Sequence, residues 1–487
     1  MTGNILFYGD NLDILRRHIG DETVDLIYLD PPFNSKATYN VLFAEKNGSQ
    51  AAAQFKAFED TWRWDQDAAK TYEEIVEGGK NIARTLIAFN ELFGKNDMLT
   101  YLVMMASRLV ELQRVLKPTG SIYLHCDPTA SHYLKILMDA SFGPKNFRNE
   151  IVWHYRKWAT GKYAFQKNHD VLLFYFRSDS RKRTFNQLYM ERAPSTLKRF
   201  GTSKIVSGHD ETGRRVPSRT KQQESEGVRQ DDVWAIGRVP PIKQLFPTQK
   251  PGPLLERIIT SSSNENDLIL DPFCGCGTTI AVAQRLHRRW IGIDITYLAI
   301  TVIKHRLRDE FGEGVVDYKV KGEPIALPDA KVLAEQNPYE FQWWALGLVG
   351  ARPVEQKKGA DRGIDGRLYF HDEGLGGKTK QIIFSVKAGT TTVAHVRDLR
   401  GVIEREKAEI GVLITMQKMT QPMRSEAAGA GFYESQWGKH PRIQILTIEE
   451  LLAGKRIDYP PSRQVNVTFK KAQKANKNES ATQEPLL

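Results

Sequence analysis

The sequence is poor in cysteine: Cys126, Cys274 and Cys276 are the three that occur among 487 residues. Three thiols give no disulfide framework and are typical of a protein in a reducing compartment. Cys274 and Cys276 are two positions apart, but a zinc site would need further Cys or His ligands at suitable spacing, and the sequence offers none. We therefore expect these two to be small loop residues.

Long apolar runs are also lacking. No stretch of about 18 uncharged apolar residues occurs, so we expect no membrane-spanning helix. The first residues, MTGNILFYGDNLDIL, do not combine the basic region and apolar core of a secretory signal. Hydrophobic residues make up 41% and charged residues 26%. This composition is typical of a soluble globular protein, which we expect in the cytoplasm and away from membranes.

Positive charge is in excess, and it is localised. The net charge is +11, and residues 156–245 contain 19 lysines and arginines against 9 acidic residues. Nearly the whole excess therefore lies in one central segment, where aromatic residues such as Trp158 and Tyr163 are interleaved. Such a segment is typical of a protein that binds a polyphosphate, double-stranded DNA above all. A solvated basic surface is the alternative.

Strand and helix patterns alternate on both sides of this segment. The run VDLIYL, for example, is apolar throughout, as a buried parallel strand should be. The alternation predicts an α/β fold with a doubly wound sheet, and residues 50–95 are expected to be helical. The expected strands are Asn4–Tyr8, Val24–Leu29, Ser121–Cys126, Leu268–Leu270 and Trp290–Ile293, and the expected helices are Asn11–His18, Met98–Leu116, Ala130–Met138, Gly252–Thr260, Thr278–Leu286 and Tyr297–Leu307.

A glycine-rich turn follows the strand at Leu268–Leu270. The residues DPFCGCGTT, starting at Asp271, lead from that strand into a helix, and glycines there allow a ligand to approach the backbone. A second acid, Asp294, ends the next strand 23 residues later, where it can bind ribose hydroxyls. The turn departs from the dinucleotide fingerprint, and no Walker lysine follows, which argues against NAD and ATP. A tight strand-to-helix connection is the alternative.

A second turn, Asp30-Pro31-Pro32-Phe33, stands at the end of another strand, the edge where open α/β sheets bind ligands. An exocyclic amino group of a base is a poor nucleophile because its lone pair is delocalised into the ring. The carboxylate of Asp30 and the carbonyl of Pro31 can accept its two protons, and the prolines hold both acceptors in place. Phe33 offers a face on which a rotated base can stack. Alone, the motif is equally compatible with a structural proline turn.

Together the two turns resemble those of the amino-methyltransferases that act on DNA, which methylate adenine N6 or cytosine N4. The resemblance covers roughly residues 4–310 and implies a Rossmann-like domain that binds S-adenosylmethionine. In that family the glycine loop surrounds the methionine part of the cofactor, the next acid holds the ribose, and an acid after the first strand reaches the adenine. Carried over to this chain, the implied cofactor-binding residues are Asp10, Thr248, Lys250, Asp271, Phe273, Gly275, Gly277, Thr278 and Asp294.

The order of the motifs along the chain and the residues that form them add detail. The catalytic turn precedes the cofactor loop and the basic segment lies between them, as in the beta permutation of the family, so residues 156–245 resemble its target-recognition region. Asp-Pro-Pro is more typical of adenine-N6 than of cytosine-N4 enzymes in this family, which favours adenine. The family often has Tyr where this chain has Phe33, a change that preserves stacking. The chain also lacks the Pro-Cys nucleophile motif of cytosine-C5 methylation.

The C-terminal region resembles an Mrr-like restriction endonuclease. An acid at Asp365 precedes a strand at Arg367–Phe370, and a second strand, Gln381–Val386, ends at Lys387. In that family the Asp, the Lys and an upstream helical Glu, here Glu340, bind Mg²⁺ and activate water. Ser385, however, stands where Glu or Gln is expected, and a hydroxyl is a weaker Mg²⁺ ligand than a carboxylate.

These observations predict an S-adenosylmethionine-dependent domain over residues 1–310, a linker over 311–337, a smaller α/β endonuclease-like domain over 338–460 and a disordered tail over 461–487. The favoured function is adenine-N6 methylation of DNA in a restriction–modification or phage-defence system. The alternatives are cytosine-N4 methylation, a bifunctional enzyme that also cuts DNA with Mg²⁺ bound at Asp365, and a non-catalytic DNA-binding protein. A second copy of the chain or a restriction subunit is left open as a partner.

Overall fold

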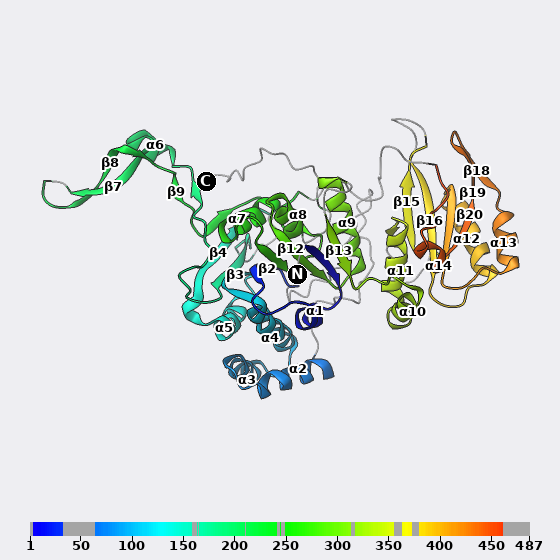
Figure 1. The fold of residues 1–487 in the computed structure, drawn as a ribbon, viewed down its shortest axis with the longest axis horizontal. Coiled ribbons are helices and arrows are strands. Elements are labelled where there is room, and N and C mark those ends of the chain that lie inside the picture. The colour runs from blue at the N-terminus through cyan, green and yellow to red at the C-terminus, as the bar shows by residue number, and fades with distance from the viewer. Residues whose placement is uncertain are drawn as a thin grey trace.

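The computed structural model describes residues 3–32, 64–157, 163, 165–209, 211–240, 244, 249–312, 317–354, 363–372 and 379–460. Within these ranges the chain forms a large α/β unit, a narrow arm that projects from one end, and a smaller α/β unit at the other end (Figure 1). Three predictions lie outside the described residues: the roles of Phe33 and Thr248, and the disordered tail at 461–487.

A nine-stranded sheet forms the centre of the large unit, in the order β10-β4-β5-β3-β2-β11-β12-β1-β13. Its neighbouring strands are parallel except for β5, which runs antiparallel to both β3 and β4. The strands are β1 (Asn4–Tyr8), β2 (Val24–Leu29), β3 (Leu116–Cys126), β4 (Phe147–His154), β5 (His169–Phe176), β10 (Val233–Ala235), β11 (Leu268–Asp271), β12 (Arg289–Asp294) and β13 (Tyr318–Lys321).

Helices cover both faces of this sheet, as the alternating pattern predicted. In β2 the side chains of Ile27 and Leu29 belong to the hydrophobic core on one face, and those of Leu26 and Tyr28 to the core on the other. No described helix is long and apolar enough to cross a membrane. The first face carries α1 (Asn11–His18), α3 (Asn81–Phe93), α4 (Asp97–Val115) and α5 (Ser131–Phe142), with α2 (Gln66–Glu77) packed on α3 and α4; the second carries α7 (Gly252–Ser262), α8 (Thr278–Arg285) and α9 (Tyr297–Phe311).

The inserted segment is shorter than expected. Residues 156–245 were expected to lie outside the α/β pattern, but two strands within them, β5 and β10, belong to the main sheet. The run Val171–Phe176 is apolar and buried, so it takes a central place between β3 and β4. What projects is the arm, built from β6 (Tyr189–Met190), α6 (Pro194–Phe200), β7 (Ser203–His209), β8 (Arg215–Glu224) and β9 (Val228–Arg229) (Figure 1).

The expected linker at 311–337 is also structured where it is described. Strand β13 pairs in parallel with β1 at the edge of the large sheet, with Ile5 opposite Lys319. Helix α10 (Leu327–Gln336) then packs on α11 (Pro338–Leu348) through the buried side chains of Ala330 and Ala334. The short strand YKVK alternates half-buried uncharged side chains with exposed lysines, as an edge strand does, and this period of two was missed in the sequence.

The C-terminal unit has its own five-stranded sheet, in the order β14-β15-β16-β17-β20. The expected strands at Arg367–Phe370 and Gln381–Val386 are confirmed as the antiparallel pair β15 and β16. Helices α10, α11 and α14 lie on one face and α12 and α13 on the other. The remaining elements are β14 (Arg352–Pro353), β15 (Gly366–Phe370), β16 (Lys380–Lys387), α12 (Val393–Arg405), β17 (Ile410–Thr415), α13 (Gln421–Ala428), β18 (Phe432–Ser435), β19 (Gly438–Pro441), β20 (Ile443–Thr447) and α14 (Ile448–Leu452).

Candidate active site

Four acidic residues meet at one edge of the large sheet. Asp30 follows β2, Asp271 ends β11, Asp294 ends β12, and Asp10 follows β1 after a single glycine. These four strands are consecutive neighbours in the sheet and run parallel. Their carboxyl ends therefore share one edge, and the two motifs separated by about 240 residues of chain come together there.

The glycine loop between β11 and α8 has a backbone that favours glycine. Gly275 and Gly277 have φ of +49° and +72°, in the left-handed region. A Cβ atom on Gly277 would lie 2.7 Å from Cγ1 of Ile303, whereas one on Gly275 would meet no atom within 4 Å. Gly277 thus lets α8 start close against α9, and Gly275 leaves open space over the loop for a ligand.

Asp294 fastens this loop to the neighbouring strand. Its Oδ2 accepts a hydrogen bond of 2.9 Å from the amide of Gly275, and its Oδ1 accepts 2.9 and 2.8 Å bonds from the amide and hydroxyl of Thr296. Burial raises the pKa of Asp294 to about 6, against the opposing effect of these hydrogen bonds. Oδ2 keeps capacity for a further hydrogen bond, so the carboxylate is suited to bind a hydroxyl group of a ligand.

Asp271 is the most enclosed of the four acids, with 2% of its surface exposed. Its Oδ1 accepts a 3.1 Å hydrogen bond from the amide of Phe273, at the start of the loop. Burial raises the pKa of Asp271 to about 7, and the charges of Asp30 and Asp294 add to the rise. Phe273 is partly buried against the core on the α4 face. Asp271 therefore holds the start of the loop through this hydrogen bond, and its pKa depends on the charges of Asp30 and Asp294.

A network that sequence reasoning missed ties Asp10 to the glycine loop. Asp10 caps the N-terminus of α1 and accepts a 2.9 Å hydrogen bond from Nη2 of Arg108 on α4. The same guanidinium donates from Nε to Oδ1 of Asn11 over 2.6 Å, and Asn11 donates to the carbonyl of Pro272 over 2.8 Å. Asp10 remains 43% exposed, so its carboxylate is open to a ligand. From the sequence alone, Arg108 is indistinguishable from the other polar positions of an amphipathic helix.

Arg306 on α9 is a second residue that the sequence did not reveal. Its Nη1 donates to the carbonyl of Cys276 over 3.0 Å and to the hydroxyl of Thr278 over 3.1 Å. Thr278, expected to bind cofactor, is buried at the first position of α8 and takes part in this clamp. Cys274 and Cys276 are buried free thiols of the same loop. Within the described ranges, no three His, Cys, Asp or Glu side chains form a group that could hold a metal ion.

The turn that begins at Asp30 is paired with a lysine 220 positions away in the sequence. Lys250, two residues before α7, donates to Oδ2 of Asp30 in an ion pair whose side chains are 11% and 17% exposed. Pro31 is buried and Pro32 is partly buried. The cofactor role that the resemblance implies for Lys250 stays a prediction; in the structure its amino group pairs with Asp30. Oδ2 of Asp30 is thus engaged by Lys250.

A buried polar chain extends across the sheet from Tyr28, two residues before Asp30, to Tyr155 after β4. The hydroxyl of Tyr28 lies 2.9 Å from Nδ1 of His125, whose Nε2 is 3.3 Å from Asp170; Asp170 also accepts a 2.8 Å hydrogen bond from Tyr155. The hydrogen bond to His125 and the charge of Lys250 lower the pKa of Asp170, against the effect of burial. Sequence reasoning missed this chain because its members come from four different strand ends.

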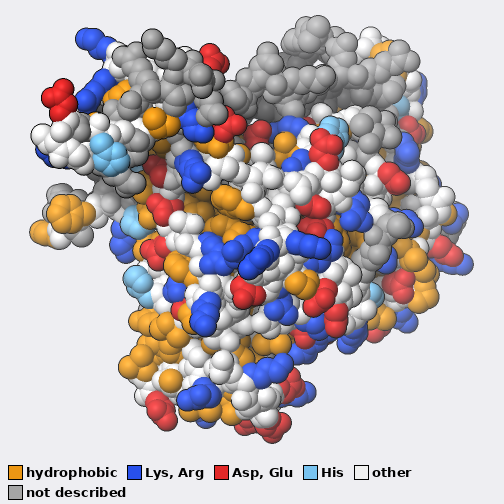
Figure 2. Space-filling model, turned by 60° about the vertical axis from the view of Figure 1, so that its left-hand side comes forward, with side chains coloured by type: hydrophobic (Ala, Val, Ile, Leu, Met, Phe, Trp, Pro, Cys, Tyr) orange, Lys and Arg blue, Asp and Glu red, His pale blue; other side chains and the backbone are white. Residues whose placement is uncertain are grey.

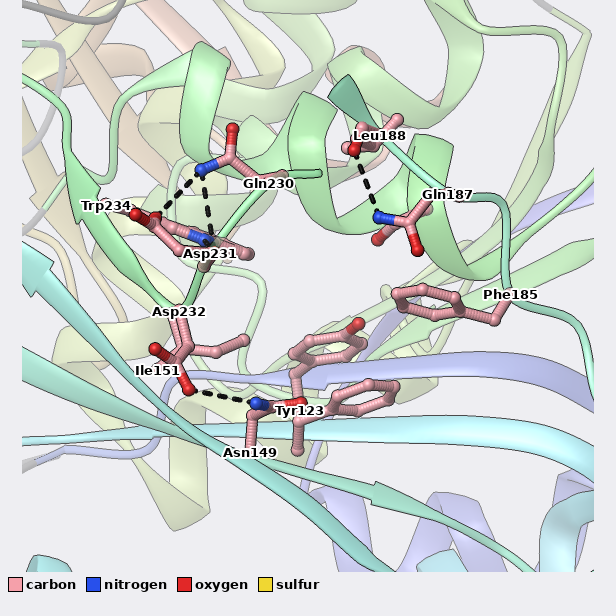
Figure 3. A pocket seen from close by; sticks show the side chains of 12 residues that line it. Tyr123, Asn149, Ile151, Phe185, Gln187, Leu188, Gln230, Asp231, Asp232 and Trp234 are labelled. Carbon is pink, nitrogen blue, oxygen red and sulfur yellow. Dashed lines mark hydrogen bonds between the residues drawn. The ribbon is translucent and has the colours of Figure 1, made fainter. Parts of the chain in front are cut away.

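A pocket of about 190 Å³ lies elsewhere, at the base of the arm (Figure 3). The rings of Tyr123 and Phe174 stack on its floor with centroids 4.3 Å apart, and Asn149 donates to Asp232 over 3.0 Å at its side. None of the predicted catalytic or cofactor-binding residues lines it. The pocket is therefore separate from the strand-end edge that carries the four acids.

In the C-terminal unit, Asp365 and Lys387 come together as predicted from their positions on adjoining strands. Asp365 is 5% exposed; its Oδ2 lies 4.0 Å from Nζ of Lys387 and accepts a 2.6 Å hydrogen bond from the amide of Val386. Ser385, buried beside them, adds no carboxylate. The carboxylate of Glu340 instead contacts Tyr8 and Tyr297 of the large unit. Among the described residues this donor set does not fit a Mg²⁺ site, which needs several oxygen ligands.

Comparison with known proteins gives two family matches. The model of the family described as "DNA methylase" matches residues 24–305, and that described as "NACHT-associated inactive Restriction Endonuclease 1" matches residues 340–453. Both matches agree with the two units of the fold.

Individual relatives agree with the first match. The chain is 31% identical over 250 residues to the type II methyltransferase M.HpaI of Haemophilus parainfluenzae, covering 50% of this chain and 71% of that protein. It is 26% identical over 294 residues to the DNA adenine methyltransferase YhdJ of Escherichia coli (strain K12), covering 60% and 78%. The structure of PvuII DNA methyltransferase (cytosine-N4-specific) covers 62% of this chain and 86% of that one at 14% identity, with a TM-score of 0.36, too low to inform function.

Proposed function

The chain belongs to the DNA methylase family, and from this premise we propose that it transfers a methyl group from S-adenosylmethionine to the N6 amino group of adenine in DNA. The observation that carries the proposal is the meeting of Asp30 with the glycine loop and Asp294 on one sheet edge. A catalytic acceptor and a nucleoside-binding loop are then side by side, as a transfer between two ligands requires.

The residues at this edge fit the cofactor. The open space above Gly275 and the left-handed turn at Gly277 give a backbone cradle, and Asp294 and Asp10 offer carboxylate acceptors to ribose hydroxyls and to the adenine. Asp271 holds the start of the loop by accepting the hydrogen bond from the amide of Phe273. When bound, S-adenosylmethionine supplies an electrophilic methyl group on a positively charged sulfur.

Asp30 acts on the other reactant. Its Oδ1 accepts a hydrogen bond from the amino group of the target base, and the Pro31 carbonyl accepts the second, so that the nitrogen lone pair is directed at the methyl group. The nitrogen–carbon bond forms as the sulfur–carbon bond breaks, and the nitrogen releases one proton toward Asp30. Lys250 holds Oδ2 and keeps the carboxylate oriented. No covalent intermediate with the protein is needed.

The arm and the surface around its base provide the DNA-binding side. Lys and Arg side chains form a band across the middle of the face that comes forward in Figure 2. Exposed basic residues such as Arg214 and Arg229 lie on the arm itself. In this proposal these charges bind the phosphate backbone in any sequence, and the arm reads base edges in a groove. A target base must leave the duplex to reach Asp30.

Adenine is the favoured base for two reasons. The catalytic turn begins with Asp, as is more typical of adenine-N6 enzymes, and the relative YhdJ is named an adenine methyltransferase. Cytosine N4 is the second candidate, because its amino group poses the same chemical problem to Asp30 and Pro31. The setting we propose is restriction–modification or phage defence in the cytoplasm.

DNA cutting by the C-terminal unit is not part of the proposal. The described residues offer a single buried carboxylate with a lysine, Asp365 and Lys387, and Ser385 in place of a second acid. The family that matches this unit is described as inactive. We propose instead that the unit binds DNA or a further protein while the large unit carries the chemistry.

The test is transfer of labelled methyl from S-adenosylmethionine to duplex DNA, followed by nucleoside analysis. We expect labelled N6-methyladenine from the parent and a loss of at least about 10³-fold in kcat for Asp30→Ala. The matched control is Asp13→Ala, because Asp13 is an exposed acid on α1 and its loss should leave kcat unchanged. Labelled N4-methylcytosine would select the second candidate. Label in neither base, or equal rates for Asp30→Ala and the parent, would contradict the proposal.

A further inference from the structure

The C-terminal unit places a buried carboxylate against the large unit. Glu340, in the first turn of α11, is 5% exposed. Its Oε2 accepts a 3.2 Å hydrogen bond from the backbone amide of Tyr297 and lies 3.5 Å from the hydroxyl of Tyr8. Tyr297 is the first residue of α9, and Tyr8 is the last of β1. Glu340 therefore caps a helix that belongs to the other unit.

That helix starts directly after the acid expected to hold the ribose. Asp294 ends β12, and its Oδ1 accepts hydrogen bonds from the amide and hydroxyl of Thr296, the N-cap of α9. Tyr8 lies opposite Asp294 across the β1–β12 pair, and the next amide, that of Gly9, donates to the carbonyl of Asp294 over 2.9 Å. Glu340 thus contacts two residues close to Asp294: Tyr297, three positions later in the chain, and Tyr8, its partner on the neighbouring strand.

The packing around Glu340 leaves it little freedom. The rings of Tyr8 and Tyr297 are 4.0 Å apart, and Tyr297 belongs to the same buried cluster as Trp344 of α11. Further along the two helices, a Cβ on Gly347 would lie 3.0 Å from Oγ1 of Thr301. Helices α9 and α11 are therefore in close contact, and this contact fixes the position of Glu340.

An acid is a costly choice for packing alone. Burial raises the pKa of Glu340 to about 7, and the charge of Asp294 adds to the rise. A neutral side chain of the same size would fill the position without removing a carboxylate from water. The acid is explained if its task is to accept hydrogen bonds at the start of α9, where the amide groups favour a negative charge.

We propose that Glu340, supplied by the C-terminal unit, is a positioning residue of the cofactor site, which holds the start of α9 and the end of β1 and thereby sets the orientation of Asp294. The inference rests on the proposed function in one respect: Asp294 must bind the cofactor ribose. Docking of the C-terminal unit and binding of S-adenosylmethionine are then coupled, and each strengthens the other.

The experiment compares S-adenosylmethionine binding by calorimetry, and steady-state methylation, in the full chain and its variants. For Glu340→Ala we expect the Kd and the KM for S-adenosylmethionine to rise about tenfold, while kcat at saturating cofactor stays within about twofold. Glu340→Gln keeps a carbonyl acceptor for the Tyr297 amide, so it should recover most of the lost affinity. The KM for DNA should not change.

Tyr339→Ala is the matched control, because Tyr339 is the neighbouring residue on α11 and is 58% exposed. It should bind S-adenosylmethionine as the parent does. Gly347→Leu tests the same coupling without touching Glu340: a larger side chain against Thr301 should separate the helices and raise the KM for S-adenosylmethionine. If Glu340→Ala does not fold, this second variant decides the outcome.

Two results would overturn the inference while the parent still binds S-adenosylmethionine. One is an unchanged Kd in Glu340→Ala, or in Gly347→Leu where the alanine variant does not fold. The other is a loss confined to kcat or to thermal stability, with the cofactor KM unmoved, which is what a purely structural role predicts. If the parent itself does not bind S-adenosylmethionine, the proposed function fails first and the coupling fails with it.

Discussion

Replacing Arg108 with Met should weaken both the fold and the cofactor site, because this guanidinium joins two residues at the sheet edge. Its bond to Asp10 spans 2.9 Å, and Asp10 is 43% exposed, so water compensates part of the loss and about 1 kcal/mol remains. Its bond to Asn11 spans 2.6 Å, and Asn11 is 8% exposed, so an unsatisfied buried acceptor there costs about 1–2 kcal/mol. The expected total is about 2–3 kcal/mol.

The assay is urea unfolding followed by circular dichroism, with S-adenosylmethionine affinity measured in parallel. Arg17→Met is the control, since Arg17 pairs with Asp13 at 3.7 Å and the two side chains are 72% and 61% exposed. Its loss should cost about 0.5 kcal/mol or less. Arg108→Met should also weaken cofactor binding, because Asn11 then holds the Pro272 carbonyl less firmly. Equal losses in the two variants would refute the reasoning.

Three further predictions concern the loop, pH and the C-terminal unit. Gly277→Ala should destabilise the protein by about 2–4 kcal/mol, because the position has a positive φ and the new Cβ would clash with α9. Thermal melts should show a smaller loss for Gly275→Ala, where the Cβ meets open space. If cofactor hydroxyls bind the ionised form of Asp294, whose pKa burial raises to about 6, affinity should approach its full value above about pH 7 and fall by up to about tenfold per pH unit below pH 6. Calorimetry of Asp294→Asn should show a smaller fall over the same pH range. Plasmid DNA incubated with the full chain and Mg²⁺ should stay uncut when analysed on gels, and Asp365→Ala or Lys387→Ala should leave methylation unchanged. Cleavage by the parent that is lost in either variant would contradict this prediction.

Local patterns were enough to predict the elements that surround the candidate site. The strand and helix at Val24–Leu29 and Asn11–His18 are as predicted, because apolar runs and helical spacing decide them locally. The strand at Trp290–Ile293 extends by one residue at each end. The doubly wound sheet follows from the alternation of such elements, since few topologies accommodate it.

Contacts between distant segments could not be predicted in this way. The pair of Lys250 with Asp30 spans 220 positions and depends on which strand lies beside which. The same holds for Arg108, which reads as a polar position on α4 until the fold places it over Asp10. Glu340 is the clearest case: its place in a helix before Asp365 suggested a nuclease ligand, while its carboxylate contacts Tyr8 and Tyr297.

Two segments were misjudged although the sequence carried a signal. The run VLLFYF within the basic segment is as apolar as any core strand, but the charge averaged over 156–245 concealed it. The short strand YKVK was hidden by its lysines, which an edge strand tolerates on its exposed side. Hydrophobicity averaged over about five to eight residues distinguishes both strands from their polar surroundings.

Strand β13 has a practical consequence for dividing the protein. It supplies the last strand of the large sheet, beside β1, and Gly322 after it lies so close that a Cβ there would be 2.1 Å from the carbonyl oxygen of Tyr8. A truncation at residue 310 would strip this strand away and leave the amides and carbonyls of β1 without their neighbour. Such an open edge promotes association between copies. A methyltransferase fragment that stays monomeric should therefore extend beyond Gly322, and the fold of the first unit ends later in the chain than its catalytic motifs do.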